Sequence, residues 1–176
     1  LAAGTFQALP LPPGEVRAGR DAMKLTVTEA VMQAVQTHAC ETFPRECCGI
    51  VVERDGRLDA LRVTNVQDER HAQDPEQFPR TAETAYTMGD EAAPILLAAD
   101  RGTLRLHAFY HSHPQHDAYF SAEDRRQARG PWDEPLYPDA GQIVVSVYDG
   151  AVRAVAAFHW DAAAADFVEV PLVVEG

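Results

Sequence analysis

Apolar residues recur at helical spacing shortly after position 28. Ala30, Val31, Ala34 and Val35 lie three to four residues apart, which is the pattern of a helix with one buried face. Thr28 precedes them, and its hydroxyl is of the kind that caps a helix N-terminus. The pattern predicts a helix that starts after Thr28 and runs to about position 43.

Two Asp-Gly pairs mark tight turns between apolar, β-branched segments. The pairs are Asp55-Gly56 and Asp149-Gly150, and this dipeptide favours the positive φ angles of two-residue hairpin turns. The flanking strands are residues 47–52 and 58–66 around the first turn, and residues 143–148 and 152–160 around the second. The sequence therefore predicts two antiparallel hairpins.

The remaining segments alternate between strand-like and helix-like patterns. Further strands are predicted at residues 104–111 and 167–174, helices at residues 88–100 and 121–128, and loops at residues 67–80 and 130–140. Pro94 lies inside the first of these helices, so the pattern does not fix the residue at which this helix begins. Strands that alternate with helices, together with two hairpins, predict an α/β domain built on a mixed sheet.

The chain has 176 residues, a length that suits one domain. Residues 1–22 carry prolines and glycines without any periodicity. We therefore expect an extended leader there, either a remnant of cloning or an upstream extension, ahead of a domain at residues 23–176.

Acidic side chains outnumber basic ones by 27 to 15, so that the net charge is −12. This balance argues against a nucleic-acid partner and against binding to an anionic membrane surface. Cys40, Cys47 and Cys48 are a poor framework for disulfides and suit a reducing compartment. The sequence has no apolar run of about 18 residues and no secretory signal, so the expected location is the cytoplasm. The sequence does not determine the oligomeric state, and an oligomer is possible.

The segment with the most chemistry runs from position 110 to 124. His111 and His113 are two residues apart at the end of a predicted strand, so both imidazoles point to the same face. Ser121 and Asp124 open the next predicted helix. Two imidazoles and one carboxylate give zinc three protein ligands and leave a fourth position for water, as a catalytic site requires.

Each half of this pattern also has a simpler interpretation. A His-x-His pair is by itself a weak sign of a metal site. Ser121 and Asp124, taken alone, are most simply a helix cap, in which Ser121 accepts backbone N–H bonds and the helix dipole favours Asp124. Both interpretations of Ser121 and Asp124 can hold together, because a cap can also fix the position of a ligand.

The whole array resembles the motif of the JAMM, or MPN-plus, zinc metalloproteases. His111-Ser112-His113-Pro114, six residues, Ser121, two residues and Asp124 match that motif without a gap. The family also has a glutamate just before its first strand, and Glu46 occupies that place, followed by Cys47-Cys48-Gly49. The resemblance extends over residues 24–174 and implies a strongly curved mixed sheet flanked by helices.

The resemblance also implies a role for each matching residue. His111, His113 and Asp124 would hold one Zn²⁺ per chain. Glu46 would take a proton from the water that zinc activates and pass it to the leaving amine, and Ser121 would hydrogen-bond the developing oxyanion. The expected activity is that of a zinc metallopeptidase or isopeptidase.

The resemblance further suggests the substrate and its contacts. Family members cleave after the Gly-Gly tail of ubiquitin or a ubiquitin-like protein, and this short chain resembles the compact prokaryotic type, for which small ubiquitin-fold modifiers or sulfur-carrier proteins are the expected partners. Such a tail can pair with a strand edge by β-addition. Candidate substrate-binding residues are Asn65, His116, Trp132 and Tyr137.

Two other classes of function remain open. Family members that lack the ligands serve as docking modules, and the intact set of ligands argues against that role here. A zinc hydrolase of small molecules is the other alternative; a deaminase would need a Pro-Cys-x-x-Cys ligand pair, which the three cysteines do not form.

Overall fold

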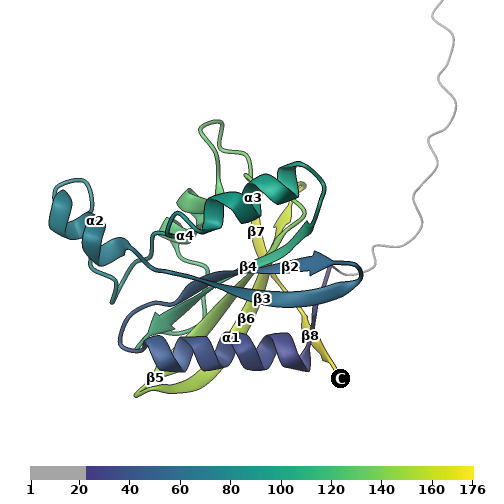
Figure 1. Cartoon of the computed structure of the whole chain (residues 1–176), viewed down its shortest axis with the longest axis horizontal. Helices are drawn as coiled ribbons and strands as arrows, with labels where there is room; N and C mark the ends of the chain where they lie inside the picture. The colour runs from purple at the N-terminus through teal and green to yellow at the C-terminus, as the bar shows by residue number, and fades with distance from the viewer. Residues whose placement is uncertain (1–22) are drawn as a thin grey trace, which may run out of the picture.

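The computed structural model describes residues 23–176, and the predicted leader at residues 1–22 lies outside them. Helix α1 (Glu29–Thr42) begins where the sequence predicts it, because the Thr28 hydroxyl accepts a hydrogen bond from the Val31 N–H at 3.3 Å. The apolar face of α1 is buried against a central sheet (Figure 1). The first predicted helix is therefore confirmed.

The central sheet has six strands in the order β3-β2-β4-β5-β6-β7. The strands are β2 (Cys48–Arg54), β3 (Arg57–Val63), β4 (Arg105–Pro114), β5 (Gly141–Tyr148), β6 (Ala151–Asp161) and β7 (Asp166–Val170). β4 and β5 run parallel and the other neighbours are antiparallel. Both predicted hairpins are present, with positive φ at Asp55-Gly56 and at Asp149-Gly150. The predicted mixed sheet in an α/β domain is confirmed.

The sheet carries helices on both faces. Helix α1 covers one face, and helices α3 (Ala92–Asp100) and α4 (Ala122–Ala128) lie on the other (Figure 1). Side chains of β2 alternate accordingly, with Val51 in the α1 core and Ile50 and Val52 in the α3 core. No helix in the described part of the chain is long and apolar enough to cross a membrane.

Three details differ from the prediction. Residues 67–80 were expected to be a loop, but they contain helix α2 (Gln67–Gln73), which has no apolar stripe and buries only Gln67. The final strand is two strands, β7 and β8 (Leu172–Glu175), separated by Pro171. β8 pairs in parallel with β1 (Leu25–Thr28), an additional strand that local patterning does not reveal.

Candidate metal centre and active site

The two histidines of the His-x-His pair lie on β4, on the face of the sheet that carries α3 and α4. Their Nε2 atoms are 3.1 Å apart, and both side chains are buried. Tyr86 stacks on the imidazole of His111 at a centroid distance of 4.8 Å. The alternation of β4 therefore brings the two imidazoles together, as the sequence predicts.

Asp124 reaches these histidines from the first turn of α4. A capping box holds it: the Ser121 N–H donates to Asp124 Oδ2 at 2.7 Å, and the Asp124 N–H donates to Ser121 Oγ at 3.1 Å. Asp124 Oδ1 lies 3.3 Å from His111 Nε2, and Asp124 Oδ2 lies 3.6 Å from His113 Nε2. The helix cap and the candidate metal-ligand position thus involve the same pair of residues, Ser121 and Asp124.

The three side chains fit a zinc ion. Their ligand atoms lie within 4.8 Å of one another. Bond lengths of about 2.0–2.2 Å place neighbouring ligand atoms of a tetrahedral zinc site about 3.3–3.6 Å apart, close to the spacings found here. His113 Nδ1 lies 3.0 Å from the Asp117 carbonyl, which favours the proton on Nδ1 and leaves the Nε2 lone pair facing the centre.

The charges at this cluster also suit a cation. Burial lowers the pKa of His111, so its ring is neutral and able to bind a metal. Burial alone would raise the pKa of Asp124, but the contacts of its carboxylate with the His111 and His113 rings and with Ser121 outweigh burial and hold this pKa far below its ordinary value. The pKa of His113 is raised, because its contacts with Asp124, the Asp117 carbonyl and Glu46 outweigh burial. A metal ion at Nε2 would displace the second proton of that ring, and the cluster would then offer two neutral imidazoles and one ionised carboxylate.

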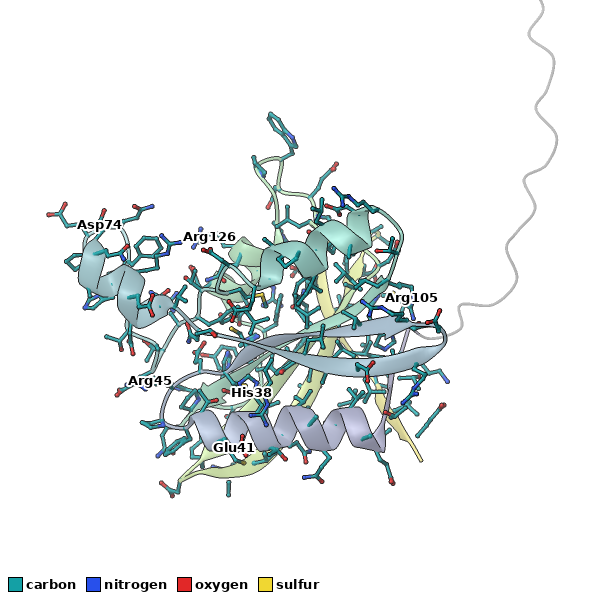
Figure 2. All side chains as sticks on the ribbon, in the orientation of Figure 1. His38, Glu41, Arg45, Asp74, Arg105 and Arg126 are labelled. Atoms are coloured by element: carbon teal, nitrogen blue, oxygen red, sulfur yellow. The ribbon has the colours of Figure 1, made fainter. Side chains whose placement is uncertain are left out.

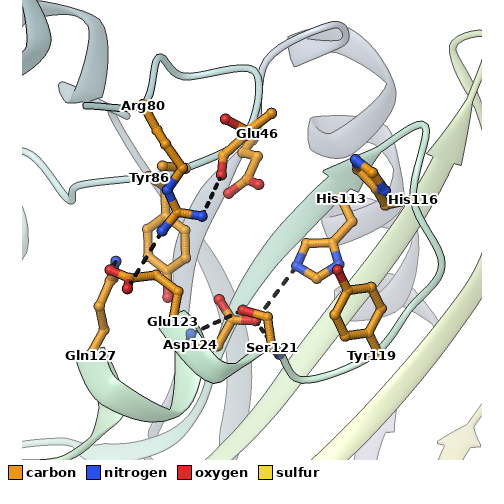
Figure 3. Close-up of a pocket in the computed structure, with 12 residues that line it drawn as sticks. Glu46, Arg80, Tyr86, His113, His116, Tyr119, Ser121, Glu123, Asp124 and Gln127 are labelled. Atoms are coloured by element: carbon orange, nitrogen blue, oxygen red, sulfur yellow. Dashed lines mark hydrogen bonds and ion pairs between the residues drawn. The ribbon is translucent and has the colours of Figure 1, made fainter. Parts of the chain in front are cut away.

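Glu46 lies between α1 and β2, in the same pocket. Its N–H donates to the Ala82 carbonyl at 2.7 Å, and its side chain faces the pocket across from Ser121 and Asp124 (Figure 3). Burial raises the pKa of Glu46 to about 8, and the Asp124 carboxylate adds to this rise. Beside a bound dication the pKa of Glu46 would fall, which would leave the carboxylate ionised near neutral pH.

The pocket itself has a volume of about 130 Å³. Besides Glu46, His113, Ser121 and Asp124 it is lined by Arg80, Tyr86, Tyr119, Gln127 and the predicted substrate contact His116. Tyr86 belongs to residues 81–87, a segment for which the sequence predicts no element and which carries no motif. Its position beside His111 comes from tertiary contacts and had no signal in the sequence.

The other three predicted substrate contacts lie in different places. Asn65 sits behind Glu46, and its side-chain amide is engaged within the protein. Tyr137 lines a second pocket that shares Tyr86 with the first. Trp132 is 85% exposed on the loop after α4 and lines neither pocket. The role of each in substrate binding stays a prediction.

Cys47 follows Glu46 but is not part of the metal cluster. It is buried in the core beneath α1, and its N–H donates to Ser112 Oγ at 2.8 Å. Burial raises the pKa of the Cys47 thiol to about 12, so the thiolate that a metal binds is not formed near neutral pH. Cys47 therefore helps to hold Glu46 beside β4 through its backbone.

The chain belongs to the family described as prokaryotic homologs of the JAB domain, because residues 28–161 match that family. This confirms the family resemblance that the sequence motif indicates. JAB-domain proteins include metallopeptidases, and zinc is the metal they commonly use.

Solved structures agree on the fold. A solution structure of a protein from Desulfitobacterium hafniense has a TM-score of 0.58 at 20% identity and covers 87% of this chain and 93% of that one. A solution structure of a protein from Salinibacter ruber has a TM-score of 0.53 at 28% identity, over 85% of this chain and 90% of that one. No curated protein matches the chain.

Proposed function

We propose that this protein is a zinc-dependent peptidase or isopeptidase that cleaves after the C-terminal Gly-Gly tail of a ubiquitin-like or sulfur-carrier protein. The convergence of His111, His113 and Asp124 beside the carboxyl of Glu46 carries the proposal. Family membership supports it, because JAB-domain proteins include metallopeptidases.

Each side chain has a distinct task in the proposed reaction. When bound, zinc acts as a Lewis acid and makes water nucleophilic near neutral pH. Glu46 accepts the proton that the attacking water loses and delivers it to the leaving amine. Ser121 Oγ already accepts the Asp124 N–H, so its own O–H proton is free to donate to the oxygen that becomes negative.

An extended edge beside the pocket supports a tail-shaped substrate. The Thr87 carbonyl accepts the Val66 N–H at 2.9 Å, and the Gly89 N–H donates to the Thr64 carbonyl at 2.8 Å. Alternate residues of an extended chain face opposite ways, so the backbone groups of Tyr86 and Met88 face away from this pairing. Those groups have no hydrogen-bond partner among residues 23–176 and can pair with an added strand.

Hydrolysis of fusions to a Gly-Gly-ended sulfur carrier tests the proposal. Zinc-loaded wild-type protein should cleave them, and Glu46→Gln should lower kcat by about 10²-fold or more, because the general base is lost. Glu83→Gln is the matched control, since Glu83 is exposed and outside the pocket. Cleavage that survives both Glu46→Gln and chelator treatment would overturn the mechanism, and zinc binding without cleavage of any fusion would favour a docking module.

A further inference from the structure

Hydrogen bonds orient two members of the candidate zinc cluster, His113 and Asp124. His113 Nδ1 lies 3.0 Å from the Asp117 carbonyl, which fixes one edge of its ring. Asp124 Oδ2 accepts the Ser121 N–H at 2.7 Å, and the capping box fixes the direction of the carboxylate. Such partners orient the ligands of a metal site, and the loss of one weakens metal binding about 10- to 100-fold.

The third member of the cluster, His111, has no partner of this kind. Its Nδ1 atom is buried and makes no hydrogen bond within the described part of the chain. Its Nε2 atom faces His113 Nε2 at 3.1 Å and Asp124 Oδ1 at 3.3 Å. Among residues 23–176, therefore, no hydrogen bond from outside the cluster keeps the His111 ring turned toward the metal position.

An aromatic ring contacts His111 instead. Tyr86 stacks on its imidazole at a centroid distance of 4.8 Å and an interplanar angle of 29°. Offset aromatic rings attract each other at centroid distances of about 4.5–7 Å. Phe120 approaches the same imidazole less closely, at 6.5 Å and 50°. A rotation of His111 away from the metal position would break its stack with Tyr86, so the stack opposes that rotation.

Tyr86 is itself held in place. The carbonyl of the next residue, Thr87, accepts the Val66 N–H at 2.9 Å, and the residue before it, Ala85, is buried. The Tyr86 side chain is partly buried and lines the pocket (Figure 3). A ring with a fixed backbone and a restricted side chain can restrict the ring that it contacts.

We propose that Tyr86 is the positioning residue for His111, and that its ring does for this ligand what hydrogen bonds do for His113 and Asp124. The inference rests on the metal centre of the proposed function and makes no use of the substrate. The stack keeps His111 Nε2 directed at the centre of the cluster before the ion binds. Without the ring, zinc binding would have to restrict the imidazole itself, at a cost in affinity.

Two tyrosines provide matched variants, because each is partly buried and packs on a ring of β4. Tyr86 packs on His111, whereas Tyr137 packs on Phe109 at a centroid distance of 5.4 Å. Tyr86→Leu and Tyr137→Leu each remove one aromatic ring, but only Tyr86→Leu removes it from a candidate metal ligand. Tyr86→Met is a second variant without a ring, and Tyr86→Phe keeps the ring and should behave as wild type.

Two measurements report on the metal site without depending on catalysis. They are the Kd for zinc, from competition with a chromophoric chelator, and the visible absorption of Co²⁺-loaded protein, which depends on coordination geometry. Tyr86→Leu and Tyr86→Met should raise this Kd about ten-fold and change the intensity of the Co²⁺ bands. Tyr137→Leu should leave both unchanged, although urea denaturation should show a lower free energy of unfolding. A merely structural role for Tyr86 would lower stability alone.

The outcomes separate the role of Tyr86 from the proposed activity. Wild-type Kd and Co²⁺ absorption in folded Tyr86→Leu or Tyr86→Met protein would overturn the inference. Equal losses of affinity in Tyr86→Leu and Tyr137→Leu would also overturn it, because they would indicate a general loosening of the domain. The expected series of affinities without cleavage of any fusion would support the role of Tyr86 and contradict the peptidase. Wild-type protein that binds neither metal would contradict both.

Discussion

The side-chain amide of Asn65 donates a hydrogen bond to the backbone carbonyl of Glu46 at 3.0 Å. The same amide nitrogen donates to the Ala85 carbonyl at 3.1 Å, and Asn65 Oδ1 accepts the N–H groups of Gln67 and Thr87. One side chain thus joins the segment of the candidate base to the extended edge beside the pocket. Both parts of the candidate site depend on this connection.

Replacement of Asn65 by alanine should disturb both parts. The substitution leaves the backbone groups that Asn65 now hydrogen-bonds without partners. This loss should lower the free energy of unfolding by about 1–3 kcal/mol, as measured by urea denaturation. The kcat for Gly-Gly fusions should fall because Glu46 loses its anchor, while zinc content stays unchanged because no ligand contacts Asn65. Wild-type kcat in folded Asn65→Ala protein would contradict this role.

Ser121 should affect both stability and rate. Ser121→Ala removes the acceptor for the Asp124 N–H, and loss of such a cap costs about 1 kcal/mol of stability. It also removes the free O–H donor, for which a loss of about 10²–10³ in kcat is expected. Ser121→Thr keeps both groups and serves as the control in steady-state assays. A Ser121→Ala variant with unchanged kcat would exclude Ser121 as an oxyanion donor.

Gly49 leaves room for the buried ring of Tyr110 behind the site. A Cβ atom at position 49 would lie 2.2 Å from Tyr110 Cζ, far inside van der Waals contact. Gly49→Ala should therefore destabilise the fold by about 1–3 kcal/mol or more. At Gly56, no atom lies within 4 Å of such a Cβ, and alanine there should cost only about 1–2 kcal/mol for its positive φ. Equal thermal stability of Gly49→Ala and wild type would refute the close packing.

His38 should make stability sensitive to acid. It points from α1 toward the sheet, where Nδ1 lies 3.0 Å from the Tyr110 hydroxyl (Figure 2). The pKa of His38 is lowered from 6.5 to about 4, chiefly by burial and also by Arg62, and Glu41 partly opposes this lowering. The folded state binds this proton more weakly than the unfolded state. The contribution of neutral His38 to the free energy of unfolding is therefore complete above pH 6.5 and is lost as the pH falls toward 4.

Urea denaturation of chelator-treated protein at several pH values measures this contribution. As the pH falls from 6.5 to 4, the free energy of unfolding of wild type should decrease by about 3 kcal/mol more than that of His38→Gln, which has no ring to protonate. His159→Gln provides a control for the removal of a histidine in general. Parallel pH profiles for wild type and His38→Gln would contradict the account.

The sequence predicts the convergence of His111, His113 and Asp124 because the geometry that brings them together is local. Strand alternation places His111 and His113 on one face, and the helix cap places Asp124 at the start of α4. The position of Glu46 could be predicted only from the family motif, because Glu46 reaches the pocket through tertiary contacts such as the hydrogen bond from its N–H to the Ala82 carbonyl.

The parts that the sequence did not predict depend on contacts between distant segments. Helix α2 lacks apolar periodicity and was predicted as a loop, and β1 pairs with β8 across most of the chain. The position of Tyr86 follows from pairing between residues 64–66 and 87–89. Neither periodicity nor turn residues mark such pairings in advance.

Zinc content after dialysis, measured by elemental analysis, tests the central claim most directly. Wild type and Glu46→Gln should each hold about one equivalent, because Glu46 lies outside the ligand set. Asp124→Asn should bind zinc at least about ten-fold more weakly, although its amide oxygen can still accept the Ser121 N–H. Wild-type protein that holds no zinc even after its addition, or Asp124→Asn protein that binds zinc as wild type does, would contradict the metal centre.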